Sequence, residues 1–430
     1  MSKPQIAFYG LGAMGGGMAT NLAKKGYPIT GFDVYTPLID KLISAGGHPA
    51  STPAAAASSP PASIAIIMVA TMYQATSLLF EGDAPAISGI PKNAVLILCS
   101  TCPPSYPEQL HKLLLDNGRG DVQLLDCPVS GGTIRAAAGT LSIFASGPDE
   151  ALRLAHGVLR DMSANLYPVL GGISGGQKVK CIHQLLAATN IISASEAMGL
   201  AATAGLDTRE VYDYVKTEGR GTSFMFENRA PHMLDDDWTV LSALGIIWKD
   251  AGIVVDAAKE VRFPVPLANA AEQLYVMGHV RGLLKEDDAR LVVMYLPEGE
   301  AGKVGLLAGK GEKGKGKGGI GKEDVDDLLA GVHLAASVEA MAFCKALGME
   351  RKMMYEIISK AAGWCKVYTT HIEEMLEADE WTLKQCKGAE EIRKRLEAVV
   401  DKCRAIGFPC QMASTALQQY YFAGLGTPKW

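Results

Sequence analysis

The stretch QIAFYGLGAMG, Gln5–Gly15, is a short apolar run that leads directly into a glycine-rich loop. A strand followed at once by Gly-x-Gly-x-x-Gly is typical of parallel α/β folds, in which the loop opens a helix. We expect that helix to extend through Lys24. The first glycine permits a tight turn, the second lets the backbone approach a pyrophosphate, and the third allows the helix to pack closely on the strand.

A carboxylate downstream of this loop indicates which dinucleotide would bind. Asp33 lies at the end of the second expected strand, 18 residues after Gly15. A carboxylate there accepts hydrogen bonds from ribose hydroxyls and repels a 2′-phosphate. We therefore predict NAD as the cofactor, with NADP less favoured. The predicted cofactor contacts of the loop are Gly10, Leu11, Gly12, Ala13, Met14 and Gly15.

Apolar runs alternate with amphipathic or alanine-rich stretches over the N-terminal part of the chain. Several runs are almost continuously apolar, as expected of strands covered by helices on both faces. The pattern predicts a doubly wound, mostly parallel sheet in a dinucleotide-binding domain over residues 1–168. The expected strands are Gln5–Tyr9, Ile29–Asp33, Ser63–Val69, Ala94–Cys99, Val122–Asp126 and Leu141–Ala145.

The rest of the chain has a helical pattern that occurs twice. Strand signals stop at about Gly171, and Lys178–Ala204 predicts one long helix in an all-α domain over residues 169–297. The segment HQLLAATNIISASEAMGLAATAGLD, 183–207, resembles DDLLAGVHLAASVEAMAFCKALGME, 326–350, and further matches follow in register. We predict a second helical copy over residues 323–430, joined through a flexible glycine- and lysine-rich linker at 298–322.

Two such copies packed face to face would bury apolar surface that one copy leaves exposed. The chain is therefore predicted to be either a monomer that forms an internal pseudo-dimer or a homodimer.

Lys180, His183 and Gln184 are spaced so that they share one face of the expected long helix. Because they lie in its first turns, the positive end of the helix dipole helps to lower the lysine pKa. Such a lysine can take a hydroxyl proton as hydride leaves the same carbon. The second copy has acidic residues at these places: Glu323, Asp326 and Asp327. Only the first copy is predicted to be catalytic.

A second set of candidates follows the strand that ends at Asp126. The sequence Ser130-Gly131-Gly132 offers a hydroxyl and two glycine amides, which can hold a carboxylate when the N–H groups converge. The same dipeptides also occur in ordinary turns.

Four motifs in this order resemble the β-hydroxyacid dehydrogenase family, which includes 3-hydroxyisobutyrate, 6-phosphogluconate and L-threonate dehydrogenases. They are Gly10–Leu22, Asp126–Leu141, Gly175–Lys180 and Lys249-Asp250, and the resemblance covers residues 4 to about 290. The Lys-x-x-His-Gln form is most similar to the L-threonate branch.

The resemblance implies roles for single residues. Lys180 would be the general acid/base, Ser130, Gly131 and Gly132 would hold the substrate carboxylate, and His183 and Gln184 would contact substrate hydroxyls. Further cofactor contacts would come from Val69, Ala70, Gln74, Thr101 and Lys249. Val69-Ala70 stands where the family usually has Leu-Pro, and Arg395 of the second copy stands at the place of Asp250.

Composition narrows the classes of protein and partner. Apolar residues make up 48% and charged residues 20% of the 430 residues, with a net charge of -5, which gives no reason to expect nucleic acid or a membrane as partner. Neither a signal peptide nor a membrane span is expected. The nine cysteines predict reduced thiols in a cytoplasmic protein, and Cys99-x-x-Cys102 has no second pair to complete a metal site, so no metal is predicted.

Together these features predict an NAD-dependent oxidoreductase that acts on the alcohol of a short polar hydroxy acid, such as a threonate-like sugar acid. Two alternatives stay open at this point. One is an NADPH-dependent aldehyde, semialdehyde or imine reductase of the same family. The other is a non-catalytic, cofactor-binding scaffold.

Overall fold

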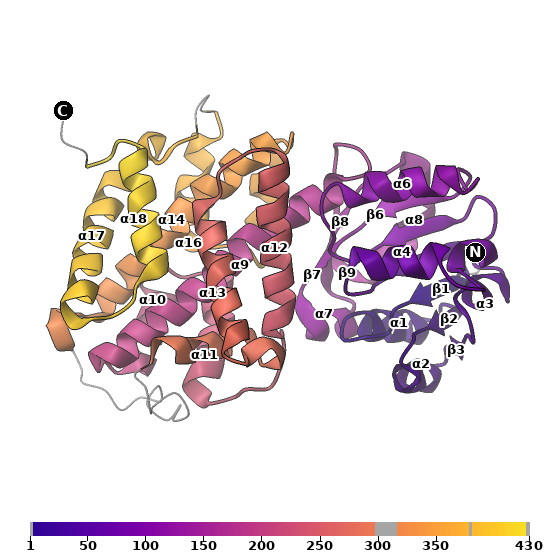
Figure 1. The fold of residues 1–430 in the computed structure, drawn as a ribbon, viewed down its shortest axis with the longest axis horizontal. Helices are drawn as coiled ribbons and strands as arrows, with labels where there is room; N and C mark the ends of the chain where they lie inside the picture. Colours follow the sequence, from indigo (N-terminus) through magenta and orange to yellow (C-terminus); the bar gives the residue numbers. More distant parts are fainter. Residues whose placement is uncertain (1–2, 297–315, 378–380, 427–430) are drawn as a thin grey trace. The chain divides into compact units, whose positions relative to one another are not determined.

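The computed structural model describes residues 3–296, 316–377 and 381–426 (Figure 1). It contains two compact units, Met1–Cys181 and Ile182–Trp430, and the boundary lies within the long helix α9, Gly175–Ala204. Most of the predicted linker at 298–322 lies outside the described residues. Its last part includes a short 3-10 turn, η5, at Lys317–Gly319.

The N-terminal unit contains a six-stranded parallel sheet in the order β3-β2-β1-β4-β5-β6. The predicted doubly wound sheet is therefore confirmed. The strand order reverses between β1 and β4, and in such sheets ligands bind outside the carboxyl ends of the strands at this reversal. The strands are β1 (Ile6–Tyr9), β2 (Ile29–Phe32), β3 (His48–Pro49), β4 (Ile64–Ile67), β5 (Val95–Leu98) and β6 (Gln123–Asp126).

Alternate residues of each strand enter two different hydrophobic cores. In β1, Ile6 and Phe8 pack with residues of α1 and α8 on one face, whereas Ala7 and Tyr9 pack with residues of α4 and α6 on the other. All four strand residues are fully buried, which explains the almost continuous apolar run in the sequence. The helices are α1 (Gly15–Lys24), α4 (Met72–Phe80), α6 (Tyr106–Asp116) and α8 (Asp149–Asp161); shorter ones are α2 (Ile39–Ser44), α3 (Pro53–Ser58), α5 (Ala86–Gly89) and α7 (Gly132–Ala138).

A second, three-stranded sheet contains β7 (Val129–Ser130), β8 (Leu141–Ala145) and β9 (Ser163–Pro168). The strand expected at Leu141–Ala145 exists, but it pairs antiparallel with β7 and parallel with β9 instead of joining the main sheet. Strands β3, β7 and β9 were not predicted from the sequence. The first two are only two residues long, and β9 has no buried apolar run.

The C-terminal unit consists of helices whose order repeats. The first set is α9, α10 (Thr208–Thr217), α11 (Phe224–Asp235), α12 (Leu244–Glu260) and α13 (Pro266–Val280), followed by the 3-10 turns η2 (Leu283–Lys285) and η3 (Asp288–Tyr295). The second set is α14 (Lys322–Ala346), α15 (Arg351–Ile358), α16 (Lys366–His371), the 3-10 turns η6 (Glu373–Met375) and η7 (Leu383–Gln385), α17 (Ala389–Ile406) and α18 (Gln411–Phe422). Helix α12 packs against α13, and α14 packs against α17 and α18 (Figure 1).

Corresponding residues of the two sets make corresponding contacts. Phe224 donates its N–H to the carbonyl of Trp364 at 3.0 Å, and Lys366 donates to the carbonyl of Thr222 at 2.9 Å. Ser223 and Cys365, which precede the two donors, face each other in an isolated antiparallel bridge. Ser223 thus faces its own counterpart, and the two hydrogen bonds beside it are reciprocal, as expected where two related copies meet about a local two-fold axis.

One buried glutamate in each set accepts hydrogen bonds from a helix of the other set. Glu196 of α9 accepts hydrogen bonds from the first N–H groups of α18, at Met412 and Ala413, both at 2.9 Å. Glu339 of α14 accepts from the first N–H groups of α13, at Leu267 and Ala268, both at 3.0 Å. Since the first N–H groups of a helix have no partner within it, each long helix caps the last helix of the other set.

Helices α9 and α14 are long and apolar enough to cross a membrane by composition alone. In the described residues 94% and 89% of their most apolar windows are buried, as expected of core helices. All nine cysteines are buried free thiols.

Candidate functional site

The glycine loop after β1 has the geometry that a dinucleotide needs. Gly10 has φ +87°, and a Cβ there would lie 2.3 Å from the carbonyl oxygen of Met68. A Cβ on Gly15 would lie 1.9 Å from the carbonyl oxygen of Gly10, whereas Gly12 faces open space. Two glycines are thus required by the fold, and the third leaves room for a pyrophosphate at the start of α1.

Asp33 holds this loop in place. Its carboxylate accepts hydrogen bonds from the N–H of Leu11 at 2.7 Å and from the N–H of Tyr35 at 2.8 Å. Because a carboxylate has about four acceptor positions, these two bonds leave capacity for ribose hydroxyls. The loop and Asp33 therefore fit an NAD-type dinucleotide.

The loops after β4 and β5, which contain the predicted cofactor residues Val69, Ala70 and Thr101, are tied together. The Val69 N–H donates to Ser100 Oγ at 2.9 Å. The side-chain oxygen of Gln74 accepts from the N–H of Thr71, in the capping box of α4, and also from the N–H of Ala70 at 2.9 Å. In this structure Gln74 therefore positions the loop, and the sequence analysis gave it only a lining role.

Gln177 was not among the predicted site residues, although the motif before Lys180 contains it. Its amide donates to the carbonyl of Ser100 at 2.8 Å and accepts from the N–H of Cys102 at 3.0 Å. Its backbone N–H donates to the buried Asp126 at 2.7 Å. Burial raises the pKa of Asp126 to about 8, and the bond from Gln177 opposes this shift. Gln177 thus joins the start of α9 to the strand ends beside Thr101.

The Ser130-Gly131-Gly132 turn joins β7 to α7. Ser130 is buried, and the two glycines have φ +140° and +71°. Residues other than glycine rarely adopt these backbone angles, and a Cβ on Gly131 would lie 2.8 Å from Cδ of Arg135. The turn therefore depends on both glycines, as a backbone carboxylate cradle would.

Lys180, His183 and Gln184 lie on one continuous helix, α9, within three turns of its first residue. All three side chains are buried, with exposed fractions of 6%, 1% and 7%. Burial of polar groups is costly unless they are paired, so their partners decide what they can do.

A chain of polar contacts connects α9 to α12. Lys249 Nζ lies 2.9 Å from Asp250 Oδ1, and Asp250 Oδ2 accepts a hydrogen bond from Gln184 Nε2. The side-chain oxygen of Gln184 lies 2.8 Å from His183 Nδ1. Asp250 is 5% exposed, so its charge is balanced mainly by Lys249 and the Gln184 amide.

This chain of contacts orients the His183 ring. Asp250 fixes the amide of Gln184, because only the NH₂ group can donate to a carboxylate. The Gln184 oxygen can only accept, so His183 carries a proton on Nδ1. The contact from Asp250 through Gln184 therefore holds the His183 ring in one orientation.

Two family models match the chain. The model of the NAD-binding domain of 6-phosphogluconate dehydrogenase matches residues 5–171. The model described as NAD-binding of NADP-dependent 3-hydroxyisobutyrate dehydrogenase matches twice, at residues 174–295 and 324–427. The second match falls on the α14–α18 set, so the same model describes both helical sets.

Known proteins resemble the chain over different lengths. L-threonate dehydrogenase of Cupriavidus necator is 38% identical over 290 residues, which are 67% of this chain and 95% of the relative. The crystal structure of 3-hydroxyisobutyrate dehydrogenase from Salmonella typhimurium is 33% identical and covers 68% of this chain and 100% of its own, with a TM-score of 0.61. The 6-phosphogluconate dehydrogenase of Plasmodium falciparum is 15% identical, covers 100% of this chain and 93% of its own, and has a TM-score of 0.67. This last likeness is one of fold alone, and it includes the second helical set.

Proposed function

Because this chain belongs to the β-hydroxyacid dehydrogenase family, whose members are oxidoreductases that act on CH–OH groups with NAD(P), we propose that it oxidises a short, polyhydroxylated acid with NAD and that Lys180 is its general acid/base. The observation that carries this proposal is the polar face of α9. There a buried lysine precedes a histidine whose ring is held in one orientation by Gln184 and Asp250.

Different residues would transfer the proton and hold the substrate during alcohol oxidation. The glycine loop Gly10–Gly15 and Asp33 would hold NAD, which would supply the acceptor for the hydride of the carbinol carbon. Lys180 in its neutral form takes the hydroxyl proton, which otherwise would leave a positively charged carbonyl oxygen. Ser130 and the N–H groups of Gly131 and Gly132 hold the substrate carboxylate, which fixes the acid relative to Lys180.

The proposed substrate class follows from His183. Its ring, which Gln184 holds in one orientation, would hydrogen-bond a second substrate hydroxyl, and a site built to hydrogen-bond a hydroxyl discriminates strongly against analogues that lack one. A threonate-like acid offers such a hydroxyl beside the reacting one. The 38% identity to an L-threonate dehydrogenase supports the same class.

A panel of hydroxy acids, assayed with NAD by the absorbance of NADH, tests this proposal. L-threonate and related sugar acids should be turned over with higher kcat/KM than 3-hydroxyisobutyrate. A flat response to the whole panel would leave a cofactor-binding scaffold as the better explanation, and preferred turnover of 3-hydroxyisobutyrate would refute the role given to His183.

The preference for NAD over NADP rests on Asp33. Its carboxylate, held beside the glycine loop by Leu11, would repel a 2′-phosphate. Wild-type protein should favour NAD, and Asp33→Ser should move the ratio of kcat/KM for NAD and NADP toward NADP. Wild-type turnover that is faster with NADPH and an aldehyde or imine would favour the reductase alternative.

We also propose that the second helical copy is structural and completes the first as an internal pseudo-dimer. The reciprocal bonds of Glu196 and Glu339 support this view. The domain boundaries 1–168, 169–297, 298–322 and 323–430, the oligomeric state and a cytoplasmic location stay predictions. Sizing in solution would separate a monomer from a homodimer.

A further inference from the structure

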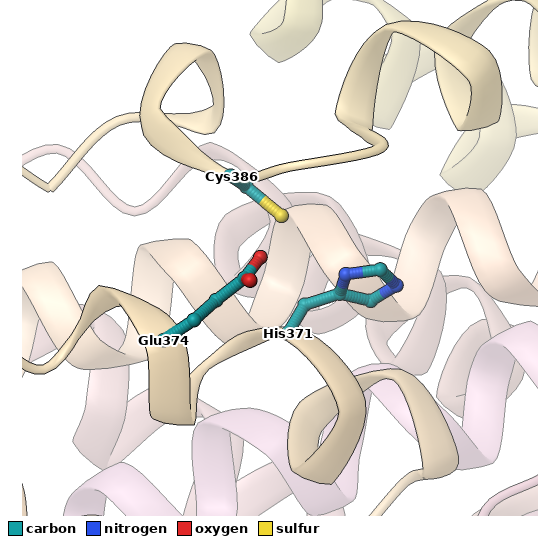
Figure 2. Close-up of side chains that lie close together, drawn as sticks. All are labelled: His371, Glu374 and Cys386. Carbon is teal, nitrogen blue, oxygen red and sulfur yellow. The ribbon is translucent and has the colours of Figure 1, made fainter.

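Three side chains of different chemistry converge in the second helical copy, away from the residues proposed for catalysis. His371 ends α16, Glu374 lies in η6, and Cys386 directly follows η7. One ligand atom from each lies within 4.8 Å of the other two. Figure 2 shows the thiol, the carboxylate and the imidazole directed toward a common space.

The local backbone explains how the three meet. His371 and Glu374 are three residues apart where an α-helix passes into a 3-10 turn, and residues at this spacing lie on one side of such a turn. Cys386 arrives from a later part of the chain at the end of another 3-10 turn. The cluster thus brings together the end of α16 with η6 and the residue after η7.

We propose that His371, Glu374 and Cys386 form a binding site for one divalent ion of the zinc type, with a fourth position left for water or another ligand. Thiolate, imidazole and carboxylate are the three side-chain ligands that zinc uses, and nitrogen and sulfur donors disfavour magnesium and calcium. The site is independent of the proposed dehydrogenase function.

The chemistry of the three side chains suits one ion. Ion binding requires a thiolate at Cys386, and that thiolate together with the Glu374 carboxylate would balance the two positive charges of the ion. The His371 imidazole would supply a neutral nitrogen ligand.

The backbone of Lys387 contacts two of the proposed ligands, the half-buried His371 and the buried Cys386. The Cys386 thiol donates to it at 3.5 Å, and the His371 ring also hydrogen-bonds to the Lys387 backbone. A carbonyl that holds a histidine ring is a common second contact in metal sites, because it fixes the tautomer and orients the ring. The Lys387 ammonium, 3.9 Å from Glu374, is 88% exposed and can turn away when an ion enters.

In the first helical copy a different residue stands at the position of His371. Ser223 and Cys365 are counterparts, and six residues beyond them stand Arg229 and His371. Arg229 forms a double hydrogen bond with the fully buried Asp288, at 2.6 and 2.9 Å. The position that supplies a proposed metal ligand in the second copy thus forms an ion pair in the first.

Full-length protein stripped with a chelator and titrated with Co²⁺ or Zn²⁺ tests the site. We expect one ion per chain, a thiolate-to-cobalt charge-transfer band, and a higher unfolding temperature with Zn²⁺. Cys386→Ser should abolish the band, and His371→Gln and Glu374→Gln should each weaken binding by roughly tenfold or more.

Cys344→Ser is the matched control, because Cys344 is another buried thiol of the same unit, with its hydrogen bond to the Met349 carbonyl. It should leave the band and the affinity unchanged. Glu374 is exposed, so its variant should fold even if Cys386→Ser does not. Failure to bind Co²⁺ and Zn²⁺, or binding that survives both the Cys386 and the Glu374 variants, would overturn the proposal whatever the dehydrogenase assay gives.

Discussion

The starts of α9 and α14 are counterparts in sequence, but their polar residues have opposite partners. On α9, Gln184 donates to Asp250 on α12, and the Gln184 oxygen lies 2.8 Å from His183 Nδ1. On α14, Asp326 accepts from the N–H groups of Arg220 and Gly221 at 2.9 and 2.8 Å. In the second copy Asp326 therefore binds the protein's own backbone, whereas in the first copy the polar residues of α9 bond to other side chains.

Each of the two helices also contacts one charged residue of a later helix, on α12 in the first copy and on α17 in the second. Asp250 bonds to Gln184 in the first copy, and its sequence counterpart Arg395 lies 3.8 Å from Asp327 in the second. The two residues still meet, but the donor and acceptor are exchanged: Gln184 of α9 donates to Asp250, whereas Asp327 of α14 is the anionic partner of Arg395. A duplicated fold can thus keep its geometry after losing its site, because contacts between helices require complementary partners and not particular ones.

Replacing the proposed base should have the largest effect. Lys180→Ala should lower kcat by roughly 10²–10⁴-fold, since the hydroxyl proton then has no acceptor on the helix. The measurement is steady-state turnover of the best hydroxy acid, with NADH binding as the check that the protein is folded.

The matching change in the second copy sharpens this test. Glu323→Lys in the Lys180→Ala background should restore nothing, because the residues around Glu323 bind backbone and not substrate. Recovery of turnover would mean that α14 also carries a working site, and the contrast between the copies would be lost.

Asp250→Asn should have the next largest effect, because an amide can no longer force the Gln184 oxygen toward His183. Loss of a charged hydrogen bond of about 1.5–3 kcal/mol corresponds to roughly a 10–150-fold fall in kcat/KM for a threonate-like acid. The fall for 3-hydroxyisobutyrate should be smaller, since that acid lacks the second hydroxyl.

An equal loss for both acids would show that Asp250 supports the fold and not the orientation of His183.

In the second copy the corresponding effect should appear in stability instead of turnover. Asp326→Ala leaves two N–H groups, of Arg220 and Gly221, without their acceptor and should lower the free energy of unfolding by about 1–3 kcal/mol. Denaturant unfolding measures this loss. Glu323→Ala, at an exposed position on the same helix, should change stability little. A fall in kcat at full saturation without loss of stability would contradict the structural role of Asp326.

The buried glutamates that the two copies share predict a pH dependence. Burial raises the pKa of Glu196 to about 8 and that of Glu339 to about 7, although backbone N–H bonds oppose the shift. Between the ordinary value of 4.5 and these values, the folded chain holds protons that the unfolded chain has released. The free energy of unfolding contributed by these groups is therefore highest at low pH and falls as the pH rises toward about 8.

The double variant Glu196→Gln, Glu339→Gln should flatten this part of the pH profile, because glutamine cannot titrate. Exposed Glu260→Gln is the control and should leave the profile as it is. A profile unchanged by the double variant would mean that neither glutamate titrates in this range.

The sequence predicted the features that depend on local pattern. Five of the six expected strands lie in the main sheet, the long helix is present, and the repeat matches helix by helix. Gln177, Asp126 and Glu196 were missed as supports of the site and of the fold. Each acts on backbone N–H groups distant in sequence, which no spacing rule reveals. One signal was present: Glu196 and Glu339 are charged residues kept at the same place in two alanine-rich helices.

The smallest expected effect concerns Arg395, the counterpart of Asp250. Its side chain is 47% exposed, lies 3.8 Å from Asp327 and bonds to the exposed Glu391 at 2.8 Å. Exposed ion pairs contribute about 0–1 kcal/mol, so Arg395→Ala should change the free energy of unfolding by no more than that and leave kcat/KM unaltered. The ratio of the kcat/KM losses in Asp250→Asn and Arg395→Ala measures how far turnover depends on this contact in the first copy and not in the second. A loss of turnover on Arg395→Ala as large as that of Asp250→Asn would show that the second copy also supports catalysis.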